Sequence, residues 1–207
     1  MGHPRPGVTA RKLAGVRDPY WNHNTHYHPW LLAQLPATAD TALDIGCGDG
    51  LLARKLARRC PSVLGVDIDA PVLAGAAPAP NVTYRQADFR YLTGTFDYVT
   101  AVATIHHVPV DEGLTALRRL VAPGGTLAVV GLWSMSLRAD YDYLLRYPLI
   151  RAVDLLHRKS DPPAPTRDPE ETLDDIRRSA AENVPGATIR KRLLWRYTLL
   201  WHRPASE

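Results

Sequence analysis

The sequence has few cysteines and no long apolar segment. Its 207 residues include only Cys47 and Cys60, so neither a disulfide framework nor a cysteine-based structural zinc site is indicated. No apolar run approaches the roughly 20 residues that a membrane-spanning helix needs, and residues 1–16 lack the apolar core of a secretory signal peptide. These absences predict a cytoplasmic protein with no membrane partner.

An excess of charge of either sign is also lacking. The chain carries 25 Lys and Arg residues against 21 Asp and Glu residues, a formal net charge of +4. So small a bias does not by itself indicate a nucleic-acid-binding protein. Because 45% of the residues are hydrophobic, a chain of this length can bury a sizeable core. The composition therefore predicts one domain over residues 1–207.

What the chain does contain is an apolar run, Thr41–Ile45, that leads into three glycines at alternate positions, Gly46, Gly48 and Gly50. Glycine permits positive φ and leaves no Cβ between the backbone and a bound molecule. Residues 51–59 follow with the apolar spacing of a helix. A strand, a glycine turn and a helix in this order predict a nucleotide-cofactor site.

The spacing of these glycines argues against two common nucleotide sites. The dinucleotide fingerprint G-x-G-x-x-G would need a glycine at the position of Leu51. No Gly-Lys-Ser or Gly-Lys-Thr follows, so a phosphate-binding loop would lack its lysine. The pattern that fits is acidic-x-Gly-x-Gly-x-Gly, from Asp44 to Gly50.

With this pattern the chain resembles the class I S-adenosylmethionine-dependent methyltransferases, specifically their small single-domain members. The motifs that carry the resemblance follow the family's order and are residues 44–50, 63–69, 86–89, 96–109 and 120–130. The resemblance implies S-adenosylmethionine as the cofactor. It also implies an α/β fold, a Rossmann-like three-layer sandwich with a seven-stranded, mostly parallel sheet and an antiparallel last strand.

The resemblance further implies which residues bind the cofactor. Asp67 would hold both ribose hydroxyls, because one carboxylate offers acceptor lone pairs to two donors, and Ile68 would pack on the adenine. Asp88 would accept from the adenine amino group, and Phe89 would contact the ring through its backbone or side chain. Any one of these aspartates alone could instead cap a helix or a turn. The full implied set is Asp44, Gly46, Cys47, Gly48, Asp67, Ile68, Asp88, Phe89, Ala103 and Tyr20.

A general base is needed only if the methyl acceptor has a proton to lose. The family places its acceptor beside the loop after the fourth strand, where this chain has His106 and His107. A histidine titrates near neutrality and could take a proton from a hydroxyl, a thiol or a ring nitrogen. His107 and His106 are therefore the candidate catalytic residues, with Thr104 and Tyr20 as weaker ones. The alternative is that the two histidines only shape the loop.

Residues 1–36 are predicted to cover the cofactor, since the resemblance places an N-terminal segment there. Residues 18–30 are rich in histidine and aromatic side chains, but no carboxylate or cysteine accompanies these histidines at ligand spacing, so no metal site is predicted. Ordinary aromatic packing is the alternative for this stretch. The side chains predicted to lie near the methionine part of the cofactor are Tyr20, Asn24, Tyr27 and His28.

Residues 131–185 depart from the alternation of strands and helices and are predicted to form a helical lid that determines acceptor specificity. After them, residues 187–195 and 197–202 are expected to close the sheet as a strand pair. Together these features favour a methyltransferase with a small-molecule acceptor. The sequence specifies neither the acceptor atom nor the oligomeric state.

Two other functions are weighed against this one. A methyltransferase acting on RNA, DNA or protein is suggested by the basic residues at 190–196. The loop after Val102, however, lacks the Asn-Pro-Pro-Tyr or Asp-Pro-Pro-Tyr signature that holds a flipped base or an amide nitrogen, which argues against nucleic acid as a partner. The third function is a non-catalytic cofactor-binding protein of the same fold.

Overall fold

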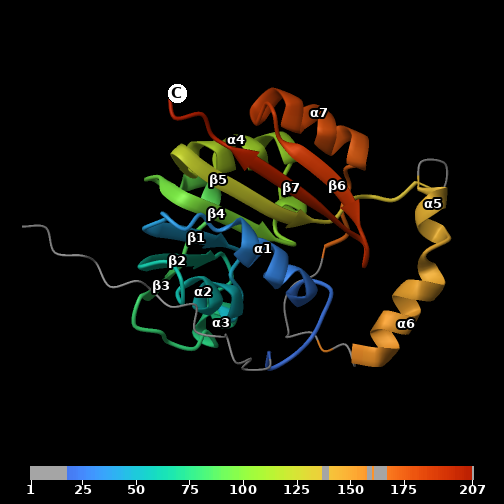
Figure 1. Ribbon diagram of the computed structural model, residues 1–207, viewed down its shortest axis with the longest axis horizontal. Coiled ribbons are helices and arrows are strands. Elements are labelled where there is room, and N and C mark those ends of the chain that lie inside the picture. The colour runs from blue at the N-terminus through green and yellow to red at the C-terminus, as the bar shows by residue number, and fades with distance from the viewer. Residues whose placement is uncertain (1–17, 137–139, 158–159, 161–166, 207) are drawn as a thin grey trace, which may run out of the picture.

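A seven-stranded sheet with the strand order β3-β2-β1-β4-β5-β7-β6 forms the centre of the protein (Figure 1). The computed structural model describes residues 18–136, 140–157, 160 and 167–206. The strands are β1 (Thr41–Ile45), β2 (Ser62–Asp67), β3 (Val82–Gln86), β4 (Phe96–Val102), β5 (Val121–Gly131), β6 (Thr188–Arg192) and β7 (Arg196–His202). Strands β1 to β5 pair in parallel, and β7 pairs antiparallel with both β5 and β6. The predicted fold class is confirmed, including the antiparallel last strand.

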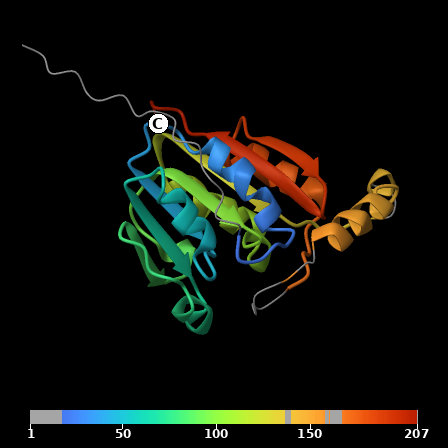
Figure 2. The ribbon, with the colours of Figure 1, turned by 60° about the horizontal axis from the view of Figure 1, so that its bottom comes forward.

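Helices cover both faces of this sheet (Figures 1 and 2). The helices are α1 (His28–Gln34), α2 (Leu51–Leu56), α3 (Ala70–Ala74), α4 (Val110–Leu120), α5 (Tyr141–Leu144), α6 (Tyr147–His157) and α7 (Leu173–Asn183). Side chains alternate between the two faces of a strand. In β1, Leu43 and Ile45 join the core under α4 and α7, whereas Ala42 joins the core under α1 and α2. The result is a three-layer sandwich.

The topology brings the carboxyl ends of β1, β2 and β4 to one edge of the sheet. The chain moves outward from β1 to β2 and β3 on one side and from β4 to β5 on the other. Ligands of open α/β sheets bind where the strand order reverses in this way. Two short 3-10 helices follow strands at this edge, η2 (Phe89–Tyr91) after β3 and η3 (Ile105–His107) after β4.

The predicted lid range, 131–185, divides into two structurally different parts. Helix α7 packs against α4 within the sandwich, because Leu173, Ile176 and Ala180 are buried in the main core. Only α5 and α6 lie beside the sheet and cover neither of its faces (Figures 1 and 2). Among the helices that the structure describes, none is long and apolar enough to cross a membrane.

Candidate cofactor and acceptor site

The glycine turn after β1 adopts a conformation that disfavours other residues. Gly46, Gly48 and Gly50 have φ of +66°, +54° and +73°, where a side chain would cost about 1–2 kcal/mol. A Cβ at Gly46 would overlap Thr104, and one at Gly50 would overlap Tyr84. A Cβ at Gly48 would meet only Val72 Cγ1, at 4.0 Å. Gly48 therefore faces open space in which a ligand can approach the backbone.

Asp67 at the end of β2 holds this turn in place. Its Oδ2 accepts from the Gly48 N–H at 2.9 Å, and its Oδ1 accepts from the Asp69 N–H at 3.0 Å. A carboxylate has lone pairs for further donors, so both oxygens can still accept from a diol. The side chain of Cys47, by contrast, is buried, and burial raises the pKa of its thiol. Cys47 therefore stays protonated within the turn.

Asp44 lies beneath the turn with an unsatisfied oxygen. Its side chain is buried, and its Oδ2 has no hydrogen-bond partner. Burial raises the pKa of Asp44 to about 8, opposed by a hydrogen bond from the Ala53 backbone and reinforced by Asp67 and Asp49. A cationic ligand group beside Asp44, Asp49 and Asp67 would be stabilised by their charge and would favour the ionised form of Asp44. The acidic set therefore fits the ammonium group of S-adenosylmethionine.

At the predicted adenine end, the structure adds a partner for Asp88. Arg90 donates to Asp88 from Nη2 at 2.7 Å and from Nε at 3.1 Å, which lowers the pKa of the carboxyl group. An adenine amino group would share this acceptor with Arg90. Ile68 is 68% exposed and free to pack on a ring, whereas Phe89 is buried and its side chain belongs to the core.

On the other side of the glycine turn, Ala103 follows β4 with a φ of +50°, a conformation that is uncommon for residues other than glycine. Its N–H donates to Val130 O at 2.8 Å. The hydroxyl of Thr104 donates to Ile45 O at 3.2 Å and to Val102 O at 3.0 Å. These contacts turn the chain sharply from β4 into η3, which carries the two histidines.

His106 and His107 lie side by side, with ring centroids 4.2 Å apart. Burial, then His107 and Arg196, lower the pKa of His106 to about 4. Burial and Arg167 also lower the pKa of His107, and Asp67 opposes this change. Both imidazoles are therefore neutral at pH 7, as a proton acceptor must be. The Nδ1 atom of His106 is buried without a hydrogen-bond partner.

Sequence reasoning missed the residues that hold η3 and the start of α4 in place. Arg167 donates from Nη1 to the His107 carbonyl at 3.3 Å. Glu171 accepts from the Val110 N–H through Oε1 at 3.3 Å, and its carbonyl accepts from the Ser134 N–H at 2.7 Å. No sequence periodicity links these positions, so nothing in the pattern could have paired them.

The N-terminal side chains predicted near the cofactor divide into two groups. The hydroxyl of Tyr20 donates to Asp49 Oδ1 at 3.1 Å and so reaches the glycine turn. The hydroxyl of Tyr27 donates to Leu193 O, the amide of Asn24 accepts from Arg196, and His28 is buried with its Nδ1 3.0 Å from Lys55 Nζ. The partners of these three side chains, Leu193, Arg196 and Lys55, lie outside the glycine turn. Residues 1–17 of the predicted covering segment lie outside the described residues.

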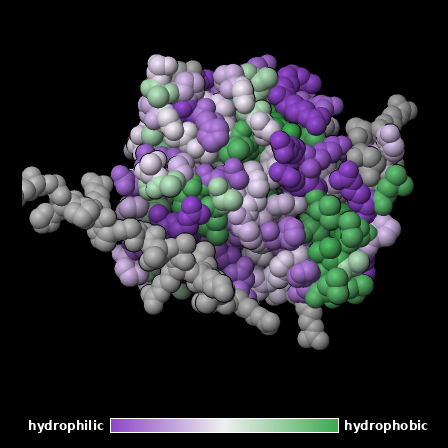
Figure 3. All heavy atoms as spheres, viewed as in Figure 1, coloured by the Kyte–Doolittle hydropathy of each residue, from purple (hydrophilic) through white to green (hydrophobic). Residues whose placement is uncertain are grey.

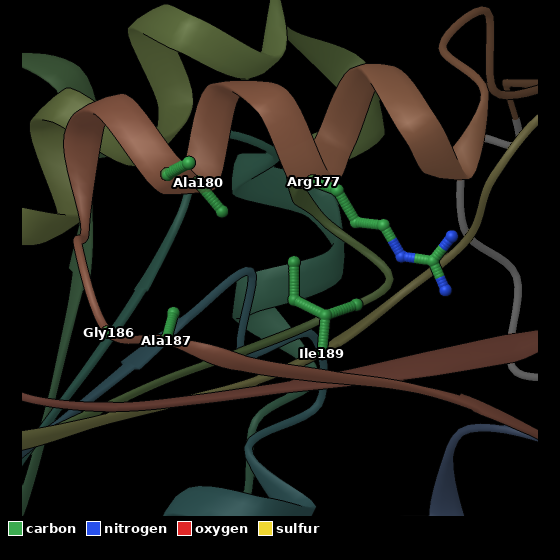
Figure 4. A pocket seen from close by; sticks show the side chains of 6 residues that line it. Arg177, Ala180, Gly186, Ala187 and Ile189 are labelled. Carbon is green, nitrogen blue, oxygen red and sulfur yellow. The ribbon is translucent and has the colours of Figure 1, made fainter.

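Away from this edge, a hollow of about 300 Å³ lies between α7 and β6 (Figure 4). It is lined by Arg177, Ala180, Ala181, Gly186, Ala187 and Ile189. Ile189 points from β6 toward α7, and only Arg177 offers a polar side chain. Its lining offers little for specific recognition. Across the described part of the chain, no group of three or more His, Cys, Asp or Glu side chains is arranged to hold a metal ion.

Comparisons with known proteins agree with this geometry. A family model described as a methyltransferase domain matches residues 43–129. The uncharacterized methyltransferase Rv0089 of Mycobacterium tuberculosis is 40% identical over 198 residues, which cover 90% of this chain and 99% of that protein. The ubiquinone biosynthesis O-methyltransferase of Acinetobacter baumannii is 31% identical over 136 residues, 55% of this chain and 57% of that protein.

A solved structure supports the fold independently. The magnesium protoporphyrin IX methyltransferase of Synechocystis PCC 6803, with bound S-adenosylmethionine, matches with a TM-score of 0.57 over 86% of this chain and 77% of its own, at 20% identity. The relative that spans nearly the whole chain carries more weight for the family. S-adenosylmethionine is the cofactor of this protein. By sequence and fold, the chain belongs to the class I S-adenosylmethionine-dependent methyltransferases.

Proposed function

We propose that this protein transfers the methyl group of S-adenosylmethionine to a small-molecule acceptor. The observation that carries the proposal is the proximity of two features at one sheet edge. The open space beside Gly48 follows β1, and the histidine pair of η3 follows β4, which is the neighbouring strand. A cofactor held at the first feature would present its reactive end toward the second.

The cofactor is held by residues from three strand ends. Asp67 would accept from the two ribose hydroxyls, and Asp44, with Cys47 and the glycines of the turn around it, would face the amino acid part. Ile68 and Asp88 would contact the adenine. Tyr20 would close the site from the N-terminal side through its bond to Asp49. Each role follows from an acceptor, an open backbone or an exposed apolar side chain described above.

The sulfonium of S-adenosylmethionine supplies an already activated methyl group. The protein's remaining tasks are therefore to align the acceptor and to exclude water. We assign the alignment to η3 and to the lid helices α5 and α6, with residues 18–36 closing the opposite side. His107, which is half-buried and electrostatically coupled to Asp67, is the proposed general base for an acceptor with a proton to lose, and His106 supports it.

Small-molecule specificity has two lines of support. One relative, which matches 55% of this chain, is by its name an O-methyltransferase of ubiquinone biosynthesis. The Ala103–His107 turn lacks the prolines of the base-flipping signature. This absence argues against a flipped base as the acceptor and so favours a small molecule.

The test is a turnover assay with panels of phenols, carboxylic acids and amines, alongside total RNA and protein extracts, with S-adenosylhomocysteine formation as the readout. We expect turnover with at least one small-molecule class. Methylation confined to RNA or protein would contradict the acceptor assignment. Cofactor binding with no turnover on any panel would instead indicate a non-catalytic protein. For an acceptor that turns over, His107→Gln should remove the rise of kcat with pH, and unchanged turnover at every pH would exclude the base.

A further inference from the structure

The arm formed by α5 and α6, Tyr141–His157, exposes an unusual amount of apolar surface. Six of the nine large apolar side chains that are exposed among the described residues belong to it, and they are Tyr141, Leu145, Tyr147, Leu149, Leu155 and Leu156. In Figure 3 a continuous hydrophobic patch covers the region where α6 lies in Figure 1. We propose that this arm docks on the surface of a lipid bilayer that contains anionic lipids.

The arm is firmly attached to the body, so its exposed face does not result from loose packing. Tyr143 is fully buried, and its hydroxyl donates to Arg192 O at 2.7 Å. Further along, Ile150 is buried in the main core, and Asp154 binds His23 Nε2 at 2.7 Å. The ring of His157 stacks on Trp21 with centroids 4.7 Å apart. These contacts hold the inner face of the arm against the body of the protein.

Helix geometry places the remaining apolar side chains together on the outer face. At about 100° per residue, the inner positions Ile150, Val153 and Asp154 share one side of α6. The outer arc of about 200° holds Tyr147, Leu149, Leu155 and Leu156, with Arg151 as its one charged residue. Protein grooves bind a narrow stripe spaced three and four residues apart. A broad apolar face suits the interface of a bilayer instead.

The charges of the arm indicate the sign of the surface it meets. The arm contains two acids, Asp142 and Asp154, and Asp154 is engaged by His23. Its two arginines, Arg146 and Arg151, are exposed, and Arg158 and Lys159 follow in the sequence. Basic residues next to an exposed apolar face complement anionic headgroups, whereas two such faces packed on each other would bring arginines together. Charge therefore favours a bilayer over a second copy of the chain.

Such docking requires no membrane-spanning helix. It departs from the sequence-based prediction of no membrane partner, because that prediction rested on the lack of a spanning segment and not on exposed apolar surface. Helix α6 has 11 residues, about half of what a span needs, and would lie in the plane of the interface. The inference is independent of the proposed acceptor, because it concerns where the protein binds and not what it methylates. Tyr141 and Tyr147, with polar hydroxyls on apolar rings, suit the headgroup level of such an interface.

Cosedimentation of the full chain with vesicles tests the proposal. We expect binding to phosphatidylcholine vesicles that contain phosphatidylglycerol, weaker binding to phosphatidylcholine alone, and loss of affinity at high salt. The double variant Leu155→Ser, Leu156→Ser should weaken binding by roughly tenfold or more. Arg151→Glu should weaken binding to the anionic vesicles only. Tyr91→Ser, which removes an exposed aromatic side chain outside the arm, should have no effect.

Calorimetric binding of S-adenosylhomocysteine keeps the test interpretable, since unchanged affinity in each variant shows that the sandwich is folded. Three results would overturn the proposal. They are no binding to either vesicle, binding that the double leucine variant retains, and a dimer in solution that the same variant dissociates without any vesicle binding. The last result would assign the apolar face to a second copy of the chain.

Discussion

At the glycine turn the aspartates are engaged with the backbone around them, whereas along α6 the leucines stand exposed. Asp67 receives the N–H groups of Gly48 and Asp69, and Asp49 receives that of Leu51. Leu155 and Leu156, by contrast, are 76% and 79% exposed. The first region is organised before any ligand arrives, while the second presents a surface that is complete only with a partner. Substitutions should therefore affect cofactor affinity in one region and association in the other.

The largest loss of cofactor affinity should come from Asp67→Ala. This variant removes the proposed acceptor of two ribose hydroxyls, and hydrogen bonds to a charged group contribute about 1.5–3 kcal/mol each. We expect calorimetry to show that affinity for both S-adenosylmethionine and S-adenosylhomocysteine falls by roughly a hundredfold or more. Unchanged affinity would remove the ribose assignment. Asp69→Ala is the matched control, because it removes a neighbouring carboxylate that caps α3.

The next prediction compares two glycines of the turn. A Cβ at Gly48 would enter the open space, whereas a Cβ at Gly46 would meet Thr104. In Gly48→Ala the new Cβ enters the open side of the turn, so the cost to folding should be the left-handed backbone alone, about 1–2 kcal/mol. Cofactor affinity should fall by about tenfold or more because the backbone is no longer bare. Gly46→Ala adds an overlap with Thr104 and should destabilise the fold more strongly. Urea unfolding and calorimetry measure both quantities, and equal stability losses would contradict the distinction.

These two predictions rest on residues that the sequence already indicates. The glycines act through the conformation of a local turn, so residue type and spacing suffice to recognise them, whereas Asp67, 19 positions from Gly48, is indicated by the resemblance to the family. Arg90 at Asp88, Arg167 at His107 and Asp154 at His23 depend on how side chains are oriented after folding. The last two pairs join residues 60 and 131 positions apart. Periodicity reports which face of a helix is apolar but not which partner that face meets.

The lid prediction shows the same limit. The apolar residues of 131–185 were all expected to serve one lid, yet Leu173 and Ile176 are buried in the main core while Leu155 and Leu156 are exposed. In α7 the apolar residues lie on one buried side, whereas α6 carries apolar residues on both its buried and its exposed side. Only the course of the chain between β5 and β6 determines that α7 reaches the sheet and α6 does not.

An effect that depends on pH should come from Asp44→Asn. An unfolded aspartate has a pKa of about 3.9, whereas burial raises that of Asp44 to about 8. Between these values the folded protein keeps a proton that the unfolded chain has released, so this residue's contribution to stability falls as the pH rises. The Asp44→Asn variant lacks this pH-dependent contribution to stability. Its free energy of unfolding should therefore increase relative to wild type from about pH 5 to about pH 8.

Thermal or urea unfolding at several pH values measures this difference. In the wild type, S-adenosylhomocysteine should reduce the pH dependence, because its ammonium group would hold Asp44 in the charged form. A variant whose stability follows the same pH curve as the wild type would show that Asp44 is already ionised in the free protein. Asp97→Asn is the control, since Asp97 is hydrogen-bonded to Thr41 and its pKa is lowered.

The smallest effect should come from Asp154→Ala, which removes a contact that holds the arm but leaves the residues of the cofactor site unchanged. The His23–Asp154 pair is partly buried, with side chains 11% and 21% exposed, so its removal should cost about 1 kcal/mol. That loss is confined to contacts between α6 and residues 21–23, and the glycine turn keeps all of its own hydrogen bonds. Trypsin should therefore cleave faster at Arg146 and Arg151, while S-adenosylhomocysteine affinity stays within about twofold of wild type. Asp174→Ala, which breaks an exposed pair with Arg177, should change neither rate nor affinity. If S-adenosylhomocysteine affinity falls in proportion to the faster cleavage, the arm and the glycine turn form one cooperative unit. The contrast between a preorganised glycine turn and a separate docking arm would then be wrong.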